Sequence, residues 1–107
     1  SKSDIDINKA RDNGFTALHI ASALGQVEIV RLLLSKSDID INKSADLGAT
    51  ALYIASQKNY VEVVRLLLSK SDIDINRASD YGFTPLEMAN DQGYTELVKL
   101  LEKHNNK

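Results

Sequence analysis

The chain has 107 residues and contains no cysteine. A disulfide framework, a thiolate nucleophile, an iron–sulfur cluster and a cysteine zinc site are therefore excluded. No stretch approaches the roughly 20 consecutive apolar residues that a membrane-spanning helix needs. The segment 1–4 lacks the apolar core of a secretion signal, but trimming would remove such a signal, so the question of export stays open.

The chain also lacks a large excess of either positive or negative charge. The chain carries 13 basic and 15 acidic residues, a formal net charge of −2, with no block of like charges. A nucleic-acid footprint needs a concentrated basic patch, and a polybasic membrane tether needs a basic block. Charged residues make up 26% and hydrophobic ones 43%, which is typical of a soluble globular chain. The sequence therefore predicts one compact domain that binds neither nucleic acid nor a membrane.

An internal repeat dominates what is present. The octapeptide SKSDIDIN occurs at 1–8, 35–42 and 69–76, so the period is 34 residues. It divides the chain into repeats 1–34, 35–68 and 69–102 and a C-terminal tail, 103–107. Aligned directly, the first and second repeats share 24 of 34 residues, the second and third 18, and the first and third 20. Such periodicity is typical of stacked repeat proteins, whose units bury their apolar faces only against each other.

Each repeat is predicted to contain an extended segment, a loop and two short helices. Alternation at 4–7 indicates the extended segment, and a glycine near the end of each loop indicates a backbone geometry that other residues resist. Thr16 and its equivalents are predicted helix N-caps. In the third repeat Pro85 follows at the first helical position, where its missing N–H costs nothing. The second helix has a wide apolar face at helical spacing across 27–34.

The segments GFTALHIA (14–21), VEIVRLLL (27–34) and DIN (40–42) resemble the ankyrin repeat pattern of G-x-T-P-L-H-x-A-A, E-V-V-x-L-L-L and D-V-N. The resemblance covers essentially the whole chain. It implies an all-α repeat, an α-solenoid in which helix–turn–helix pairs stack and β-hairpin-like loops project as fingers. It also implies that the fingers and the concave face of the first helices bind other proteins. Family members with asparagines like Asn42 and Asn76 are in some cases hydroxylated there, although a hydrogen-bonding role in the turn is favoured.

The chain departs from the family pattern at several positions. The usual period is 33 residues, and here the extra residue falls in 35–38. In the family the second helix usually ends at this point with a left-handed glycine. We therefore predict a longer turn without glycine. The signature histidine remains only as His19, which we expect to bond nearby backbone or Thr16 rather than a ligand. The calcium-like spacing at 38–42 lacks the required glycine and final carboxylate, since Lys43 and Ala49 stand there. No catalytic motif, metal site or cofactor is predicted, and an enzyme is not expected.

The two ends of the predicted stack differ. Polar residues in the third repeat are typical of a C-terminal cap; they are Glu87, Asn90, Asp91, Gln92 and Glu102. The first repeat has no such adjustment, so Ile20 and Ile29 are expected to be partly exposed. Either further repeats precede this one in a parent protein, or another surface covers it, such as a second copy of the chain in a homodimer.

Positions that differ between the repeats gather on the predicted fingers and concave face. The candidate partner-binding residues are Arg11, Asn13, Phe15, Ala23, Leu24, Ala45, Leu47, Ala49, Gln57, Lys58, Ser79, Tyr81, Phe83, Asp91 and Gln92. Phe15, Leu47, Tyr81 and Phe83 are the candidate anchors, because aromatic and arginine residues dominate binding hot spots. The competing interpretation is drift, since exposed positions vary in any repeat array.

Three functional hypotheses follow. The favoured one is a non-catalytic module that binds a protein partner through its fingers and concave face. The perfect triplication of SKSDIDIN also suits an engineered repeat protein without a natural ligand. The third is a self-associating array that pairs through its uncapped first repeat.

Overall fold

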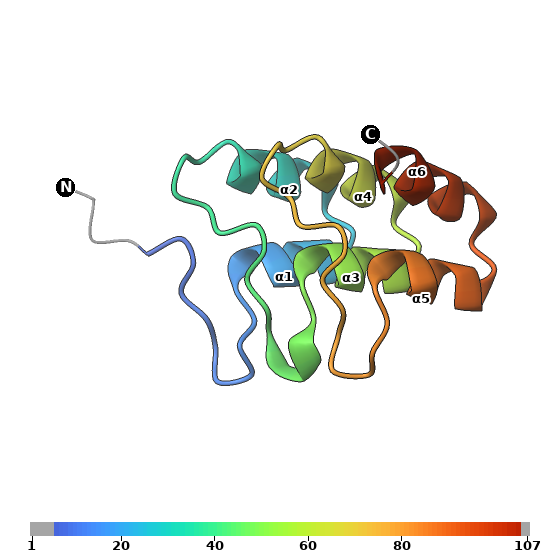
Figure 1. Cartoon of the computed structure of the whole chain (residues 1–107). Helices are drawn as coiled ribbons and strands as arrows, with labels where there is room; N and C mark the ends of the chain where they lie inside the picture. Colours follow the sequence, from blue (N-terminus) through green and yellow to red (C-terminus); the bar gives the residue numbers. More distant parts are fainter. Residues whose placement is uncertain (1–5, 106–107) are drawn as a thin grey trace.

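A computed structural model describes residues 6–105, and there the chain folds into a two-layered stack of helices (Figure 1). The helices are α1 (Ala17–Ala23), α2 (Val27–Leu34), α3 (Ala51–Gln57), α4 (Val61–Leu68), α5 (Pro85–Gln92) and α6 (Thr95–Asn105), with a 3₁₀ turn η2 (Asp46–Gly48). The helices α1, α3 and α5 form one layer and α2, α4 and α6 the other, and three loops project beyond the first layer (Figure 1). The predicted all-α repeat stack is confirmed.

The first helix of each repeat begins where the sequence predicts. Thr16, Thr50 and Thr84 are the N-caps, and each hydroxyl accepts the backbone N–H of the third helical residue. Pro85 occupies the first position of α5. Helices of seven or eight residues are unstable alone in water, so they depend on packing against their neighbours.

One hydrophobic core runs through all three repeats. It joins Leu18 and Val30 of the first repeat to Leu52 and Val64 of the second and to Leu97 of the third. The central helix α3 is the most enclosed first-layer helix, with all residues from 51 to 56 buried. Because the core crosses the repeat boundaries, each repeat stabilises the next.

The two ends of the stack differ as predicted. Ile29 on α2 is 46% exposed, whereas Val63, its equivalent on α4, is 1% exposed. Ile20 is likewise half-buried while its equivalent Ile54 is buried. The polar residues of the third repeat are all exposed at the other end; they are Glu87, Asn90, Asp91, Gln92 and Glu102. The first repeat thus presents an uncovered apolar face.

The turn after each second helix lacks glycine, as the 34-residue period predicts. Helix α2 ends at Leu34, and Ser35 caps it in a right-handed conformation (φ −76°, ψ −12°). The Ser35 hydroxyl donates to the carbonyl of Leu32 at 2.6 Å, and Ser69 repeats this bond in the second repeat. Hydroxyl groups therefore satisfy helix-end carbonyls that a left-handed glycine turn usually satisfies.

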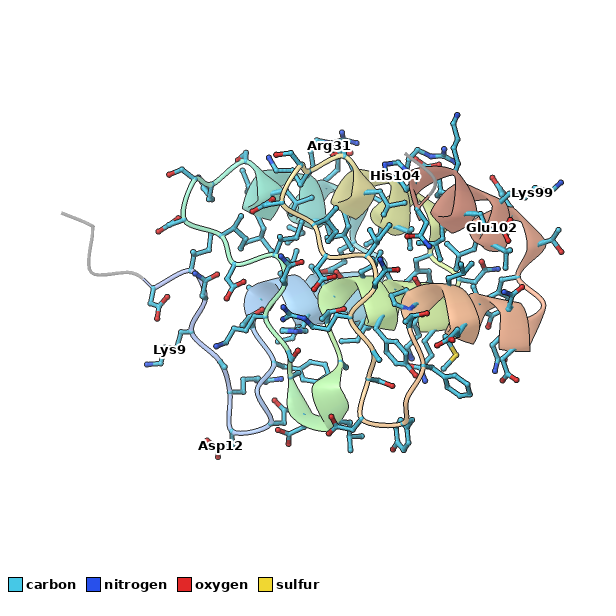
Figure 2. The ribbon with its side chains drawn as sticks, viewed as in Figure 1. Lys9, Asp12, Arg31, Lys99, Glu102 and His104 are labelled. Atoms are coloured by element: carbon cyan, nitrogen blue, oxygen red, sulfur yellow. The ribbon has the colours of Figure 1, made fainter. Side chains whose placement is uncertain are left out.

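Two expectations from the sequence are wrong or only partly met. The predicted extended segment is minimal: residues 39–40 lie between two turns, and no strand forms within residues 6–105. Residues 103–105 of the predicted tail are helical, because α6 continues to Asn105. His104 in this last turn joins α6 to the end of α4, since its Nε2 lies 3.0 Å from the carbonyl oxygen of Leu68 (Figure 2).

Candidate functional site

The three projecting loops are narrow fingers closed by backbone hydrogen bonds. In the first, the N–H of Arg11 donates to the carbonyl of Phe15 at 2.9 Å, and the equivalent bond closes the second and third fingers at 2.8 Å. Neighbouring fingers are also joined: the N–H of Asp46 donates to the carbonyl of Asn13 at 3.0 Å. In the same way, the backbone N–H of Asp80 donates to the carbonyl of Leu47 at 2.8 Å. The fingers therefore form one connected row.

All three finger glycines, Gly14, Gly48 and Gly82, have a left-handed φ, and close approach between fingers adds a second constraint at Gly14 and Gly48. Gly48 has a left-handed φ of +71°, and a Cβ built on it would lie 2.7 Å from Asp80 Oδ1 and 2.9 Å from the Asp80 backbone nitrogen. A Cβ on Gly14 would lie 3.0 Å from the Cα of Ala45. The prediction that these positions resist other residues is confirmed.

Asparagine side chains join the repeats at the base of the fingers. The Asn42 side-chain amide donates to the carbonyl of Asp72 at 2.8 Å and accepts the N–H of Asp74 at 2.8 Å. Asn8 makes the same pair of bonds to the second repeat. The role of Asn42 is structural, as predicted, but both of these side-chain bonds go to the next repeat rather than to the turn that contains Asn42.

His19 joins the first helix to the second repeat and is 1% exposed. Its Nδ1 accepts the backbone N–H of Thr16 at 3.0 Å, so the ring proton is assigned to Nε2, which donates to the carbonyl of Lys43 at 2.8 Å. Burial lowers the pKa of His19 from its usual 6.5. The structural role predicted for this histidine is confirmed.

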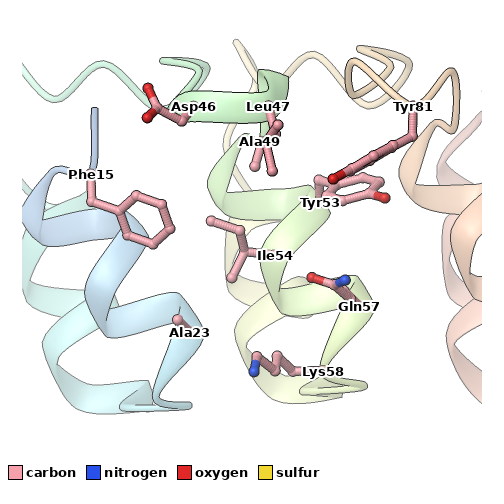
Figure 3. Close-up of a pocket in the computed structure, with 10 residues that line it drawn as sticks. All are labelled: Phe15, Ala23, Asp46, Leu47, Ala49, Tyr53, Ile54, Gln57, Lys58 and Tyr81. Carbon is pink, nitrogen blue, oxygen red and sulfur yellow. The ribbon is translucent and has the colours of Figure 1, made fainter. Parts of the chain in front are cut away.

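A pocket opens between the fingers and the first layer of helices, with a volume of about 420 Å³ (Figure 3). We call it the finger pocket. Its lining residues are Phe15, Ala23, Asp46, Leu47, Ala49, Tyr53, Ile54, Gln57, Lys58 and Tyr81. Phe15 stands on one side and Tyr81 on the other, with Ile54 between them and Lys58 at the end away from the fingers (Figure 3). The pocket is mainly apolar at its finger end and polar at its helix end.

Leu47 at the rim of the finger pocket is held in an unfavourable backbone conformation. Its φ is +66°, in the left-handed region, and its side chain is 55% exposed. Glycine or asparagine normally occupies such a position, because a Cβ costs about 1–2 kcal/mol there. The equivalents Asn13 and Tyr81 do not have a positive φ. An exposed apolar residue in a strained turn points to a role outside folding.

The structure gathers about half of the predicted binding residues at the finger pocket. Those that line it are Phe15, Ala23, Leu47, Ala49, Gln57, Lys58 and Tyr81. Others are exposed outside it; they are Arg11, Asn13, Leu24, Phe83, Asp91 and Gln92. Ala45 and Ser79 are buried, at 7% and 6% exposed, because they lie at the finger bases where the closing bonds form. Their side chains are therefore not available to a partner.

Sequence comparison of the repeats missed three residues of the pocket: Asp46, Tyr53 and Ile54. The comparison does not single out Asp46 and Ile54, because the residue types at their positions vary little between repeats. Tyr53 stands at the position of His19, which does vary, and it lies one helical turn before Gln57. Helical spacing from Gln57 and Lys58 was the signal that could have found Tyr53 and Ile54.

Within the described part of the chain, no cluster of three or more His, Asp or Glu side chains is suited to hold a metal ion. Among the same residues, no helix is long and apolar enough to cross a membrane. Two family models match the chain: a model of ankyrin repeats (3 copies) matches residues 40–107, and a model of the single ankyrin repeat matches residues 13–45. Comparison with curated proteins finds no match.

Proposed function

Since the chain belongs to the ankyrin repeat family, whose repeats are generally protein–protein interaction modules, we propose that it is a non-catalytic module whose partner docks at the finger pocket. The family is typically non-catalytic. The observation that carries the proposal is the gathering of exposed apolar side chains at one concavity: Tyr81 is 68% and Leu47 is 55% exposed. Grouped apolar residues at a surface are typical of interaction sites.

The pocket is suited to one large apolar side chain of a partner. A volume of about 420 Å³ lies in the range of ligand sites, and its walls come from rigid elements. The finger row is held by backbone bonds, and Phe15 packs against the buried ring of His19, with 5.4 Å between ring centroids. Because the walls are already ordered, little entropy is lost when a partner binds.

A display library of random 12-residue peptides tests this proposal. We expect selection on the chain to enrich peptides that bind it at least tenfold more tightly than the double variant Leu47→Asn, Tyr81→Ala. The matched control is Leu24→Asn, since Leu24 is 62% exposed but does not line the pocket. Peptides that bind the double variant and the chain equally, or no enriched peptide at all, would overturn the pocket as the docking site. The second result would favour an engineered repeat protein without a ligand.

A second candidate function is self-association through the first repeat. It rests on the 46% exposure of Ile29 at a position that is buried one repeat later. The polar surface of the third repeat does not complement this face, so a second copy would pair through the same face by a two-fold axis. Sedimentation equilibrium should show a dimer that Ile29→Gln dissociates. A monomer at all concentrations would exclude this candidate.

A further inference from the structure

The helix face beside the finger pocket becomes acidic from one end of the stack to the other. Gln57 lines the pocket on α3; its equivalent is Ala23 on α1 and Asp91 on α5. Glu87 on α5 occupies the position that Tyr53 holds on α3. Both Glu87 and Asp91 are exposed. Toward the third repeat, the apolar pocket is therefore followed by two carboxylates on one helix face.

The fingers carry carboxylates as well, one at the same position of each repeat: Asp12, Asp46 and Asp80. Asp46 lines the pocket and Asp80 is exposed on the next finger, while Lys58 is the one cation of the lining. The ion pairs within residues 6–105 join arginines to Glu28, Glu62, Glu96 and Asp74. None of them uses the carboxylates around the pocket. Within residues 6–105 these carboxylates therefore form no ion pair, although Glu87 accepts the N–H of Thr84 at 3.0 Å and Asp91 accepts the side-chain amide of Gln92 at 3.4 Å.

Exposed aromatic rings lie on the third finger, which leads directly into α5. Tyr81 and Phe83 on the third finger are 68% and 38% exposed. A guanidinium group stacks on such rings and donates hydrogen bonds from its edge to carboxylates, so an arginine matches this combination best. Lys58 repels a cation at the α3 end of the pocket, which directs a basic residue toward α5.

We propose that the partner presents an extended, basic segment, with one apolar side chain between Phe15 and Tyr81 and an arginine or lysine over Glu87 and Asp91. This proposal rests on the proposed function, because it assigns the chemistry of the segment that the finger pocket holds. Charge complementarity selects this occupant over an acidic or purely apolar segment.

The peptides selected on the chain test the charge requirement. We expect arginine and lysine to be enriched at a fixed spacing from the apolar residue. Fluorescence anisotropy with one such peptide should show about three- to tenfold weaker binding to Glu87→Gln, Asp91→Asn, since two exposed charge pairs are lost. Glutamine also supports the capping box that Glu87 makes with Thr84, so this variant keeps the start of α5.

The matched control is Glu96→Gln, Glu102→Gln, which removes the same charge from α6 in the other layer. We expect its affinity to equal that of the original chain. Higher salt should weaken binding to the original chain more than binding to the α5 variant. Peptides that need Leu47 and Tyr81 but carry no basic residue, or that bind both variants equally, would overturn the basic segment and leave the finger pocket in place. Absence of any selected peptide would overturn both.

Discussion

The imidazole Nε2 of His19 lies 2.8 Å from the carbonyl oxygen of Lys43, so a buried side chain of the first repeat holds the loop of the second. Nδ1 of the same ring accepts the N–H of Thr16, the N-cap of α1. One neutral side chain thus joins the start of α1 to the second repeat. Protonation gives Nδ1 a hydrogen and removes the acceptor that Thr16 needs.

We expect the free energy of unfolding to fall in mild acid because of His19. Burial is the largest effect and lowers its pKa in the folded chain below 6.5, the ordinary value that applies to the unfolded chain, while hydrogen bonds to the backbone of Lys43 and Ala49 oppose it in part. Between the lowered folded pKa and pH 6.5, the unfolded chain therefore binds more protons than the folded chain does. This contribution to stability is complete above pH 6.5 and decreases as the pH falls through 6.5 toward the folded value. Urea unfolding at pH 7.5 and 5.5 measures the difference.

The control for this pH dependence is His19→Tyr, because tyrosine stands at the same position as Tyr53 in the second repeat. Its free energy of unfolding should decrease less between the two pH values. An equal decrease in the original chain and in the variant would assign the effect to other groups.

Asn42→Ala should destabilise the chain by about 1–2 kcal/mol, since it leaves the carbonyl of Asp72 and the N–H of Asp74 without the amide that bridges the repeats. Asn76 is the matched position in the last repeat, and within the described residues its side chain makes no such bridge. Asn76→Ala should therefore change stability by less than about 0.5 kcal/mol. Chemical denaturation compares the two, and equal losses would contradict the bridging role.

Comparing Gly48→Ala with Gly82→Ala separates the stability cost of a left-handed backbone from the cost of close contact between fingers. Both glycines have a positive φ, +71° and +88°. Gly82 has no atom within 4 Å of an added Cβ, so alanine there should cost about 1–2 kcal/mol from conformation alone. At Gly48 the same methyl group also meets the backbone of Asp80, so a loss of about 3 kcal/mol or more is expected. Thermal unfolding of the two variants would show equal shifts if close approach were unimportant.

Leu47→Asn should raise stability by roughly 0.5–1 kcal/mol while it weakens binding at the finger pocket. Asparagine tolerates the left-handed backbone that leucine occupies there with φ +66°. Tyr81→Asn provides the control, because Tyr81 lacks a positive φ and the same substitution relieves no strain. Differential scanning calorimetry measures both. A loss of stability in Leu47→Asn would show that the leucine supports the fold.

Ile29→Ala and Val63→Ala compare one position at the end and in the middle of the stack. Val63 is 1% exposed, and its truncation should cost about 2 kcal/mol or more because it leaves a cavity. Ile29 is 46% exposed, so the larger side chain should cost less than about 1 kcal/mol. Urea unfolding midpoints, measured at low protein concentration, give the loss of stability in each variant. A large loss of stability in Ile29→Ala would mean that this face is covered in solution.

Much of the fold could be predicted because its signals are local and occur three times. A threonine before each first helix predicts the cap from a bond that spans three residues, and Pro85 marks the same boundary from its fixed φ. The unequal ends were also predictable, since Ile29 and Val63 are equivalent in sequence and differ only in what the repeat order places beside them. The contact between His104 and Leu68 could not be predicted in this way, because it joins residues that are 36 positions apart.

The sequence by itself determined the repeat and the helices, because helical periodicity, capping and recurrence depend on neighbours along the chain. Only the tertiary structure decided which varying residues meet. It buried Ala45 and Ser79 at the finger bases and brought Tyr53 and Ile54 to the pocket. It also showed that the second finger turns through a left-handed Leu47. These features depend on the spacing between stacked repeats and on bonds between adjacent fingers, which no single repeat contains.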